Sequence, residues 1–444
     1  MLIKKTLLSI IAASVIFLAL PVLAQTRDTL DSGLTVLTTS EPGSGLVAAV
    51  LFVKDGCANE SLQFAGIGNF VANLILASTR NKSAEQVAAV ADSVGGNMSV
   101  SRNADYTELR VITTSQQFGT ALSLMGEAVT EANFESEWVE SVRKSLLSQA
   151  AAENDNVFVN AYEQLLTMIY DDSPYRRTAT DTLRTIKTAK PADLRNYYNK
   201  YYVPGNMILS VAGDVSREQV LERAKIAFAG IAPKQVPATR APAEETLERS
   251  ESFMDQRDVK TGYFLMGWLA PEVSSPDYPA MSVAVNALGG GKGSAMFRNI
   301  RQKKGMGYDI GTLYPARKYQ SHAVAYIITD PFKQTPQGYV GQPVLEEVKD
   351  ALLEEVNRLK TELLTEDELT RAKGYTLGKH ILAHQRMFDR AVMPGLWEIL
   401  SGTPDFDEKY TAELEKVTAE DVRKAAEKYF TNYGLFILLP RFGE

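Results

Sequence analysis

The sequence predicts an α+β fold of two homologous domains, each a mainly antiparallel sheet covered by helices. Three observations lead to this fold class: an internal repeat, a polar segment between its two copies, and an irregular succession of strands and helices in which neighbouring strands can pair as hairpins. The chain has 444 residues, of which 45% are hydrophobic and 23% charged. These values are typical of a globular protein with more than one domain.

The repeat is clearest near the end of each half. Residues 192–202 read ADLRNYYNKYY and residues 420–430 read EDVRKAAEKYF, with Asp, Arg, Lys and Tyr at matching places and a constant offset. An apolar run follows each copy, at 207–212 and at 435–439. A run of this kind after a helix predicts a strand, so we expect each half to end in a helix followed by a strand.

A second, weaker repeat and a linker divide the chain. Residues 134–147 resemble residues 364–377 at nearly the same offset. Between the two halves, residues 233–246 are rich in Pro, Ala and charge, a composition typical of an extended, solvated linker. We therefore expect an N-terminal domain over 25–232 and a C-terminal domain over 247–444.

Local patterns predict the elements of the first half. Ser83, followed three residues later by Gln86, predicts a capped helix start, and Gly95 with Gly96 predicts the end of that helix. Around this helix, hydrophobic periodicity predicts strands at 34–39, 46–53, 97–101 and 107–113 and helices at 65–77, 115–131 and 135–153.

The first 24 residues form a separate segment. Lys4 and Lys5 precede an apolar run over 7–20, and Val22-Leu23-Ala24 offers small residues where a signal peptidase cleaves. The run is too short to be interpreted first as a membrane span, an uncleaved anchor being the alternative. No later stretch is apolar enough to span a bilayer. We expect cleavage after Ala24 and an exported, periplasmic protein.

Charge and cysteine content exclude several classes of function. The net charge is −7 and no basic run stands out, so nucleic acid is not an expected partner. Cys57 is the single cysteine, which excludes an intramolecular disulfide and a cysteine-cluster metal site. Cys57 would act as a nucleophile only beside a histidine base.

Several phrases resemble the N-terminal part of the pitrilysin/insulinase zinc peptidases, the inverzincins. They are FVKDG at 52–56, AGIGNF at 65–70, KSAE at 82–85, GGNMS at 95–99 and DYT at 105–107. Length and duplication also fit, so the resemblance covers essentially the whole mature chain. It implies that the two domains together form half of a clamshell.

The zinc motif of that family, H-x-x-E-H on a helix, is absent. In register the chain reads Asn69-Phe-Val-Ala72-Asn73, so asparagine replaces both imidazole ligands and alanine replaces the glutamate that polarises water. The family's third ligand, a glutamate, falls at Ser148 or Gln149. We therefore expect no metal bound by this chain, no peptide hydrolysis by the family mechanism, and a core helix with two polar residues facing a cavity.

The chain has three histidines, His322, His380 and His384. The last two lie four residues apart, so on a helix they share a face and have a spacing that can bind a metal. No acidic residue lies between them, and Asp389 is the nearest acidic residue after them. Two polar residues on a helix surface is the simpler interpretation.

A glycine-rich stretch, 288–308, contains a second family motif. It does not match the phosphate-binding loop pattern, and a turn that lets two elements approach closely is the simpler interpretation. The stretch also resembles the family's C-terminal motif, in which Arg precedes Tyr by seven residues, as Arg301 and Tyr308 do here. In the family this pair reaches across a central chamber toward the substrate main chain. A guanidinium suits carbonyl oxygens and a phenol suits an oxyanion. The alternative is an arginine on a helix face and a tyrosine at the start of a strand, both merely packed.

Heterodimeric bacterial members of the family divide these two motifs between subunits. The resemblance therefore implies a non-catalytic subunit of a zinc peptidase, which supplies Arg301 and Tyr308. Its partner would be a homologous subunit that contains H-x-x-E-H and zinc, and its substrates extended peptides. Two alternatives stay open: a stand-alone peptide-binding or chaperone-like protein, and a structural scaffold of the cell envelope.

Overall fold

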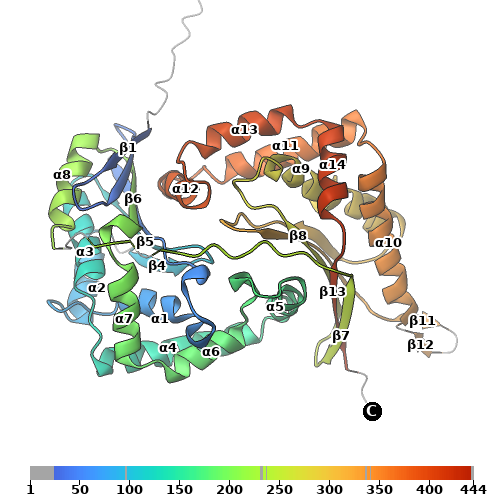
Figure 1. The fold of residues 1–444 in the computed structure, drawn as a ribbon, viewed down its shortest axis with the longest axis horizontal. Helices are drawn as coiled ribbons and strands as arrows, with labels where there is room; N and C mark the ends of the chain where they lie inside the picture. Colours follow the sequence, from blue (N-terminus) through green and yellow to red (C-terminus); the bar gives the residue numbers. More distant parts are fainter. Residues whose placement is uncertain are drawn as a thin grey trace, which may run out of the picture.

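The computed structural model describes residues 25–95, 98–230, 234–236, 238–335, 338–340 and 342–441. The signal segment predicted over 1–24 lies outside the described residues. Figure 1 shows one large sheet in each half, with helices packed around both, and a linker that crosses from the first half to the second as an extended trace.

The first sheet has the strand order β1-β2-β6-β3-β5-β4. Its neighbouring strands are antiparallel, except that β2 and β6 run parallel. The strands are β1 (Gln25–Thr29), β2 (Thr35–Ser40), β3 (Leu46–Val53), β4 (Ser99–Arg102), β5 (Thr107–Thr114) and β6 (Met207–Gly213).

The second sheet has the strand order β7-β13-β8-β10-β9, and only β7 and β13 run parallel. Its strands are β7 (Glu251–Arg257), β8 (Gly262–Ala270), β9 (Asp309–Leu313), β10 (Ser321–Thr329) and β13 (Gly434–Pro440); β11 (Lys333–Thr335) and β12 (Gly338–Val340) form a separate hairpin. Counted from β2 and from β7, both sheets place their strands in the order first, fifth, second, fourth, third. The structure thus confirms the α+β class with two equivalent, mainly antiparallel sheets.

The helices repeat in the same way. The repeated sequences form α7 and α14, which precede β6 and β13. The two copies of the weaker repeat, 134–147 and 364–377, form the first turns of α4 and α11. The capping box predicted from Ser83 and Gln86 is present at the start of α2. The helices of the first half are α1 (Ile67–Leu74), α2 (Ala84–Ser93), α3 (Phe118–Thr130), α4 (Ser136–Asn154), α5 (Val157–Ile169), α6 (Ala179–Thr188), α7 (Pro191–Tyr201) and α8 (Arg217–Ala227). Those of the second half are α9 (Tyr278–Gly289), α10 (Gln342–Thr361), α11 (Glu366–Leu382), α12 (Met387–Leu400), α13 (Phe406–Lys416) and α14 (Ala419–Tyr429), with a π-helical segment η5 (Met296–Lys303).

Each half places one helix on the sheet of the other half. Helix α5 packs against β8 and β13, and α12 packs against β3 and β6. Glycines allow these close contacts: a Cβ atom at Gly395 of α12 would lie 2.2 Å from Phe52 of β3, and one at Gly434 of β13 would lie 2.7 Å from Ile169 of α5. The two halves are therefore joined by an exchange of helices as well as by the linker.

Strand β3 is buried on both faces, as its continuous apolar run predicts. Ala48, Val50 and Phe52 belong to a core that also contains side chains of α12 and of the second sheet. Because successive strand residues point to opposite faces, the intervening ones join the helices of the first half in a separate core; they are Val47, Ala49, Leu51 and Val53. The first of these two cores therefore extends across both halves.

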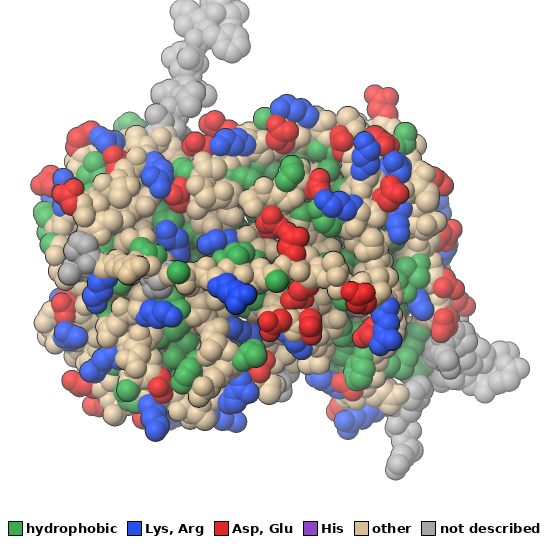
Figure 2. All heavy atoms as spheres, in the orientation of Figure 1, with side chains coloured by type: hydrophobic (Ala, Val, Ile, Leu, Met, Phe, Trp, Pro, Cys, Tyr) green, Lys and Arg blue, Asp and Glu red, His purple; other side chains and the backbone are tan. Residues whose placement is uncertain are grey.

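The linker is mostly exposed but attached at its end. Residue Glu245 accepts hydrogen bonds from the backbone N–H groups of Asp171 (2.6 Å) and Asp172 (3.0 Å), and its own backbone bonds with the amide of Gln320. On the face drawn in Figure 2, acidic and basic side chains are interspersed. Within the described ranges, no helix combines the length and the apolar character needed to cross a membrane.

Candidate functional site

Helix α1 carries the positions where the resemblance places the family's zinc motif. Asn69 and Asn73 are partly exposed on one face of α1, and Ala72 is buried. The amide nitrogen of Asn73 donates to the backbone oxygen of Asn69 at 2.8 Å and to its side-chain oxygen at 3.3 Å. Asn73 is therefore bonded to Asn69 within the helix, and Ala72 offers no group that can accept a proton.

The third ligand position lies on α4, which packs against α1. Ser148 is exposed, and its hydroxyl donates to the backbone oxygen of Lys144 at 3.1 Å. Gln149 donates to the hydroxyl of Ser145 at 3.3 Å. Amides and a hydroxyl are weak zinc ligands compared with imidazole and carboxylate. The residues at the three ligand positions therefore do not fit zinc.

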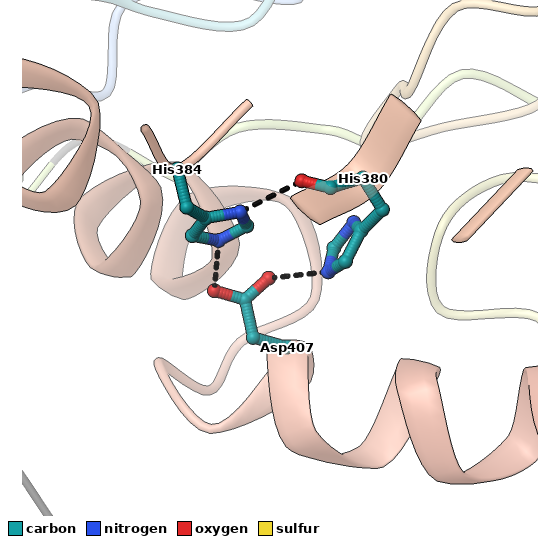
Figure 3. A group of neighbouring side chains, drawn as sticks. All are labelled: His380, His384 and Asp407. Carbon is teal, nitrogen blue, oxygen red and sulfur yellow. Dashed lines mark hydrogen bonds and ion pairs between the residues drawn. The ribbon is translucent and has the colours of Figure 1, made fainter. Parts of the chain in front are cut away.

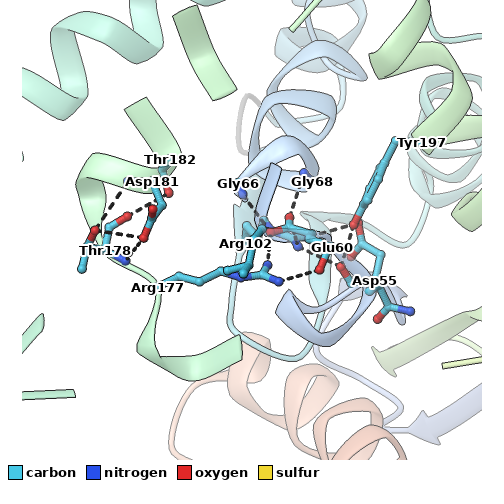
Figure 4. Close-up of polar contacts among 12 residues, drawn as sticks. Asp55, Glu60, Gly66, Gly68, Arg102, Arg177, Thr178, Asp181, Thr182 and Tyr197 are labelled. Carbon is cyan, nitrogen blue, oxygen red and sulfur yellow. Dashed lines mark hydrogen bonds and ion pairs between the residues drawn. The ribbon is translucent and has the colours of Figure 1, made fainter. Parts of the chain in front are cut away.

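A buried carboxylate holds the start of α1. Glu60 accepts the backbone N–H groups of Gly66 at 2.8 Å and Gly68 at 3.0 Å (Figure 4). Its two oxygens also bind Arg102 and Arg177, each at 2.7 Å. A carboxylate at a helix N-terminus interacts favourably with the helix dipole and with the free N–H groups. Glu60 thus fixes where α1 begins.

The same network continues to Asp55. Arg102 binds a carboxylate oxygen of Asp55 at 3.1 Å and its backbone oxygen at 2.8 Å, and the Tyr197 hydroxyl donates to that backbone oxygen at 2.9 Å. Burial raises the pKa of Asp55, an effect that Arg102 opposes. A Cβ atom at Gly68 would lie 2.3 Å from the Arg102 guanidinium, so glycine is required for this approach. The two carboxylates and the two guanidinium groups balance in charge and form a buried network beside the degenerate motif. The sequence analysis did not identify this network.

Cys57 lies beside this network. Burial, followed by the nearby Glu60 charge, raises the pKa of the Cys57 thiol. A raised pKa disfavours the thiolate, which is the nucleophilic form. The environment of Cys57 therefore does not support a nucleophilic role.

Arg301 and Tyr308 lie on connected elements of the second half. Arg301 is exposed on η5, where its guanidinium lies 5.1 Å from the ring centroid of Phe297. Tyr308 precedes β9, its backbone N–H bonds to the oxygen of Ile328 at 3.0 Å, and 48% of the residue is exposed. Both polar groups are thus presented at the surface. Upstream, a Cβ atom at Gly289 would lie 2.9 Å from Gly311, which supports the close-approach interpretation of the glycine-rich stretch.

Two further features can take part in binding. Strand β4 forms the edge of the first sheet and packs beside α1. A cavity of about 580 Å³ lies between α5 and the helices of the second half. Its wall includes His380 and six aromatic side chains, those of Phe158, Tyr162, Tyr278, Tyr314, Trp397 and Tyr410.

The two nearby histidines are not simply surface residues. His380 lies in the last turn of α11 and His384 just after this helix, and both contact Asp407 at the start of α13 (Figure 3). The sequence analysis missed Asp407 and considered Asp389, which instead caps α12 by accepting the backbone N–H of Arg386. No signal in the sequence indicates which acidic residue of the following segment folds back onto the pair.

Two family models match most of the chain. The model described as "Insulinase (Peptidase family M16)" matches residues 35–182, and the model described as "Peptidase M16 inactive domain" matches residues 188–375. The first match contains the degenerate motif on α1, and the second contains Arg301 and Tyr308.

Relatives and solved structures agree with these matches. The chain is 23% identical over 404 residues to an uncharacterized zinc protease of Rickettsia felis, covering 91% of this chain and 94% of that protein. It is 22% identical over 415 residues to the uncharacterized zinc protease YmxG of Bacillus subtilis, covering 93% and 98%. A crystal structure of a protease from Helicobacter pylori superimposes with a TM-score of 0.84 at 20% identity, covering 94% and 99%. A peptidase M16 inactive domain from Pseudomonas fluorescens gives a TM-score of 0.82 at 18% identity, covering 95% and 99%.

Proposed function

We infer that this chain, which belongs to the insulinase family of peptidases (peptidase family M16), acts as the non-catalytic subunit of an exported zinc peptidase. One observation carries the proposal. The chain has Asn69, Ala72 and Asn73 where the family has its catalytic motif, yet it presents Arg301 and Tyr308 at the surface. A chain with this combination lacks the means to cleave a peptide by the family mechanism but has groups that can stabilise the reaction in a partner.

Each of the two groups has a role suited to its chemistry. The Arg301 guanidinium would donate hydrogen bonds to carbonyl oxygens of the substrate main chain, because its planar donors match such acceptors. The Tyr308 hydroxyl would donate to the oxygen that gains negative charge as the peptide bond is attacked. A homologous partner subunit containing H-x-x-E-H would hold the zinc and the glutamate base. The M16 family membership supports this division of roles.

The same surfaces suggest how an extended peptide would bind. Strand β4 has a free edge in the sheet order and lies beside α1, and extended peptides commonly add to such edges. The aromatic cavity of about 580 Å³ could receive apolar side chains of the peptide. This cavity also favours the second candidate function, a peptide-binding or chaperone-like protein that acts without a partner.

The location follows from the N-terminal segment. Its charged start, apolar run and small residues before position 25 support export and cleavage after Ala24. N-terminal sequencing of the protein recovered from cells tests this point. A first residue of Gln25 is the expected result, and an intact Met1 would contradict cleavage.

Reconstitution tests the subunit role. The mature chain is assayed for cleavage of an unstructured peptide, alone and mixed with any H-x-x-E-H homologue that is encoded beside it. We expect activity only in the mixture, and we expect Arg301→Ala or Tyr308→Phe to lower kcat/KM by about 100-fold, the usual cost of removing a transition-state donor. Gln302→Ala, an exposed neighbour on η5, is the matched control and should leave activity unchanged.

The outcomes separate the candidate functions. Full activity of the Arg301→Ala mixture would refute the proposed role of the pair. Peptide binding by the chain alone, with no activity on mixing, would favour the chaperone-like function. Absence of both peptide binding and activity would favour a structural scaffold.

A further inference from the structure

We propose that His380, His384 and Asp407 form a binding site for a divalent transition metal of the zinc type, on the opposite half from the degenerate motif. Three possible ligand atoms of these residues lie within 4.8 Å of one another. This proposal revises the sequence-based expectation that the chain binds no metal, and it does not depend on the subunit role.

The ligand atoms converge on one carboxylate. His380 Nε2 lies 3.1 Å from Asp407 Oδ1, and His384 Nε2 lies 2.7 Å from Asp407 Oδ2 (Figure 3). His380 lies in the last turn of α11 and His384 lies in the turn that follows this helix, and their ring centroids are 5.0 Å apart. Small shifts of these side chains would place all three atoms about 2.0–2.2 Å from a shared ion, the usual ligand distance for zinc.

The hydrogen bonds of His384 place either a proton or a metal ion between its ring and Asp407. Its Nδ1 lies 2.8 Å from the backbone oxygen of His380, which can only accept a hydrogen bond, so Nδ1 carries a proton. In the neutral ring the Nε2 atom then carries a lone pair, and this lone pair points at a carboxylate oxygen. Two acceptors at 2.7 Å need either a proton or a metal ion between them. A metal ion that displaced this proton would use the Nε2 lone pair directly.

Surrounding groups hold the ligands as in known metal sites. The bond from His384 Nδ1 to a backbone oxygen fixes the tautomer of the ring, and the indole N–H of Trp397 donates to Asp407. Such supporting bonds are typical of metal-ligating histidines and carboxylates.

The donor set selects the metal. Two imidazoles and one carboxylate suit Zn²⁺ and its neighbours Co²⁺, Ni²⁺ and Cu²⁺, whereas Mg²⁺ and Ca²⁺ prefer oxygen ligands alone. Three protein ligands leave a fourth position open to water. His380 lines the aromatic cavity, so the open position would lie at its wall.

The bound metal would act as a clamp on α12. His380 and His384 lie just before this helix, and Asp407 lies just after it. A metal joining them would connect the two ends of the helix that covers the first sheet. We therefore expect binding to stabilise the folded chain, since a ligand that binds only the folded state adds to its stability.

Titration of the untagged mature chain tests the site. After dialysis against EDTA, the protein is titrated with Co²⁺, whose visible absorption reports nitrogen and oxygen ligands in tetrahedral geometry, and then with competing Zn²⁺. We expect one equivalent to bind and the thermal midpoint to rise with Zn²⁺. His384→Gln and Asp407→Asn should each weaken binding by at least about 100-fold, and Trp397→Phe by about 10-fold.

Matched variants keep the test decisive if a ligand variant folds poorly. Asp405→Asn removes an exposed acidic residue two positions from the site, and it should bind Co²⁺ as the unaltered chain does. His380→Gln provides an independent ligand variant, with circular dichroism as the check on folding. Absence of stoichiometric binding in the unaltered chain would overturn the proposal, and so would His380→Gln and His384→Gln variants that both bind Co²⁺ as tightly as the unaltered chain does.

Discussion

Mild acid should destabilise the folded chain because His322, which joins the two halves, stays neutral in the fold but gains a proton when the chain unfolds. This residue is fully buried on β10, and its ring bonds two tyrosines from the other half. The Tyr170 hydroxyl donates to the backbone oxygen of Gln320 at 3.0 Å, so its oxygen accepts the N–H of His322 Nδ1, also at 3.0 Å. His322 Nε2 then accepts the hydroxyl of Tyr162. The neutral ring is fully satisfied, and a second proton has no acceptor in this arrangement.

The size of the effect follows from the pKa of His322. Burial lowers this pKa from 6.5 to about 3. The unfolded chain therefore binds a proton below pH 6.5 that the folded chain does not bind until about pH 3. The stability that the neutral ring provides is complete above pH 6.5 and is lost as the pH falls toward 3. Between pH 7 and pH 5 the free energy of unfolding should fall by about 2 kcal/mol from this residue alone.

Urea titrations at both pH values measure this loss. The unaltered chain is compared with His322→Asn, whose amide can donate to one tyrosine and accept from the other but does not titrate. Tryptophan fluorescence and circular dichroism must give coincident transitions, because the analysis assumes two states. We expect the unaltered chain to lose about 2 kcal/mol more than the variant between pH 7 and pH 5. Equal losses would refute the reasoning.

A titrating histidine elsewhere does not disturb the comparison. Hydrogen bonding to Asp407 raises the pKa of His384, so its contribution to stability is present at low pH and is lost as the pH rises. This contribution has the opposite sign and is common to both proteins, so it cancels in the difference between them.

Two further predictions concern stability at neutral pH. Gly395→Ala should cost about 1–3 kcal/mol of unfolding free energy, because its Cβ would lie 2.2 Å from the buried ring of Phe52. Gly374→Ala, at an exposed position of α11 with nothing near its Cβ, should raise the free energy of unfolding by about 0.5–1 kcal/mol. Equal effects of the two substitutions would contradict the close packing of α12. Glu60→Gln should cost about 3–5 kcal/mol, since it leaves the buried Arg177 guanidinium without a counter-charge and Arg102 with Asp55 alone. Glu131→Gln, which breaks a pair with a largely exposed arginine, should cost at most about 1 kcal/mol. Similar costs in urea denaturation would refute the buried network.

Much of the fold was predictable because its signals are local. The strand over 46–53, the capped start of α2 and the repeated helix–strand unit each depend on residues close together in the chain. The repeat then predicts two similar sheets without any knowledge of long-range contacts. The degenerate motif at Asn69 and Asn73 was equally local, since it lies within one short helix.

The unpredicted features all join residues that are distant in the sequence. Asp407 reaches His384 across 23 residues, and nothing in its neighbourhood distinguishes it from other acidic residues. Glu60 meets Arg102 across 42 residues and Arg177 across 117. Hydrophobic periodicity shows that a helix has an apolar face but not which sheet it covers, so the exchange of α5 and α12 was also missed.

The exchange of helices has a consequence for the order in which the molecule is built during translation. The first sheet is complete once β6 has been synthesised, but one of its faces, which includes Phe52 and Ile208, is covered only when α12 emerges. Until then a ribosome-bound chain presents an apolar surface of the kind that chaperones bind. The final packing of the N-terminal half therefore waits for residues near the end of the chain.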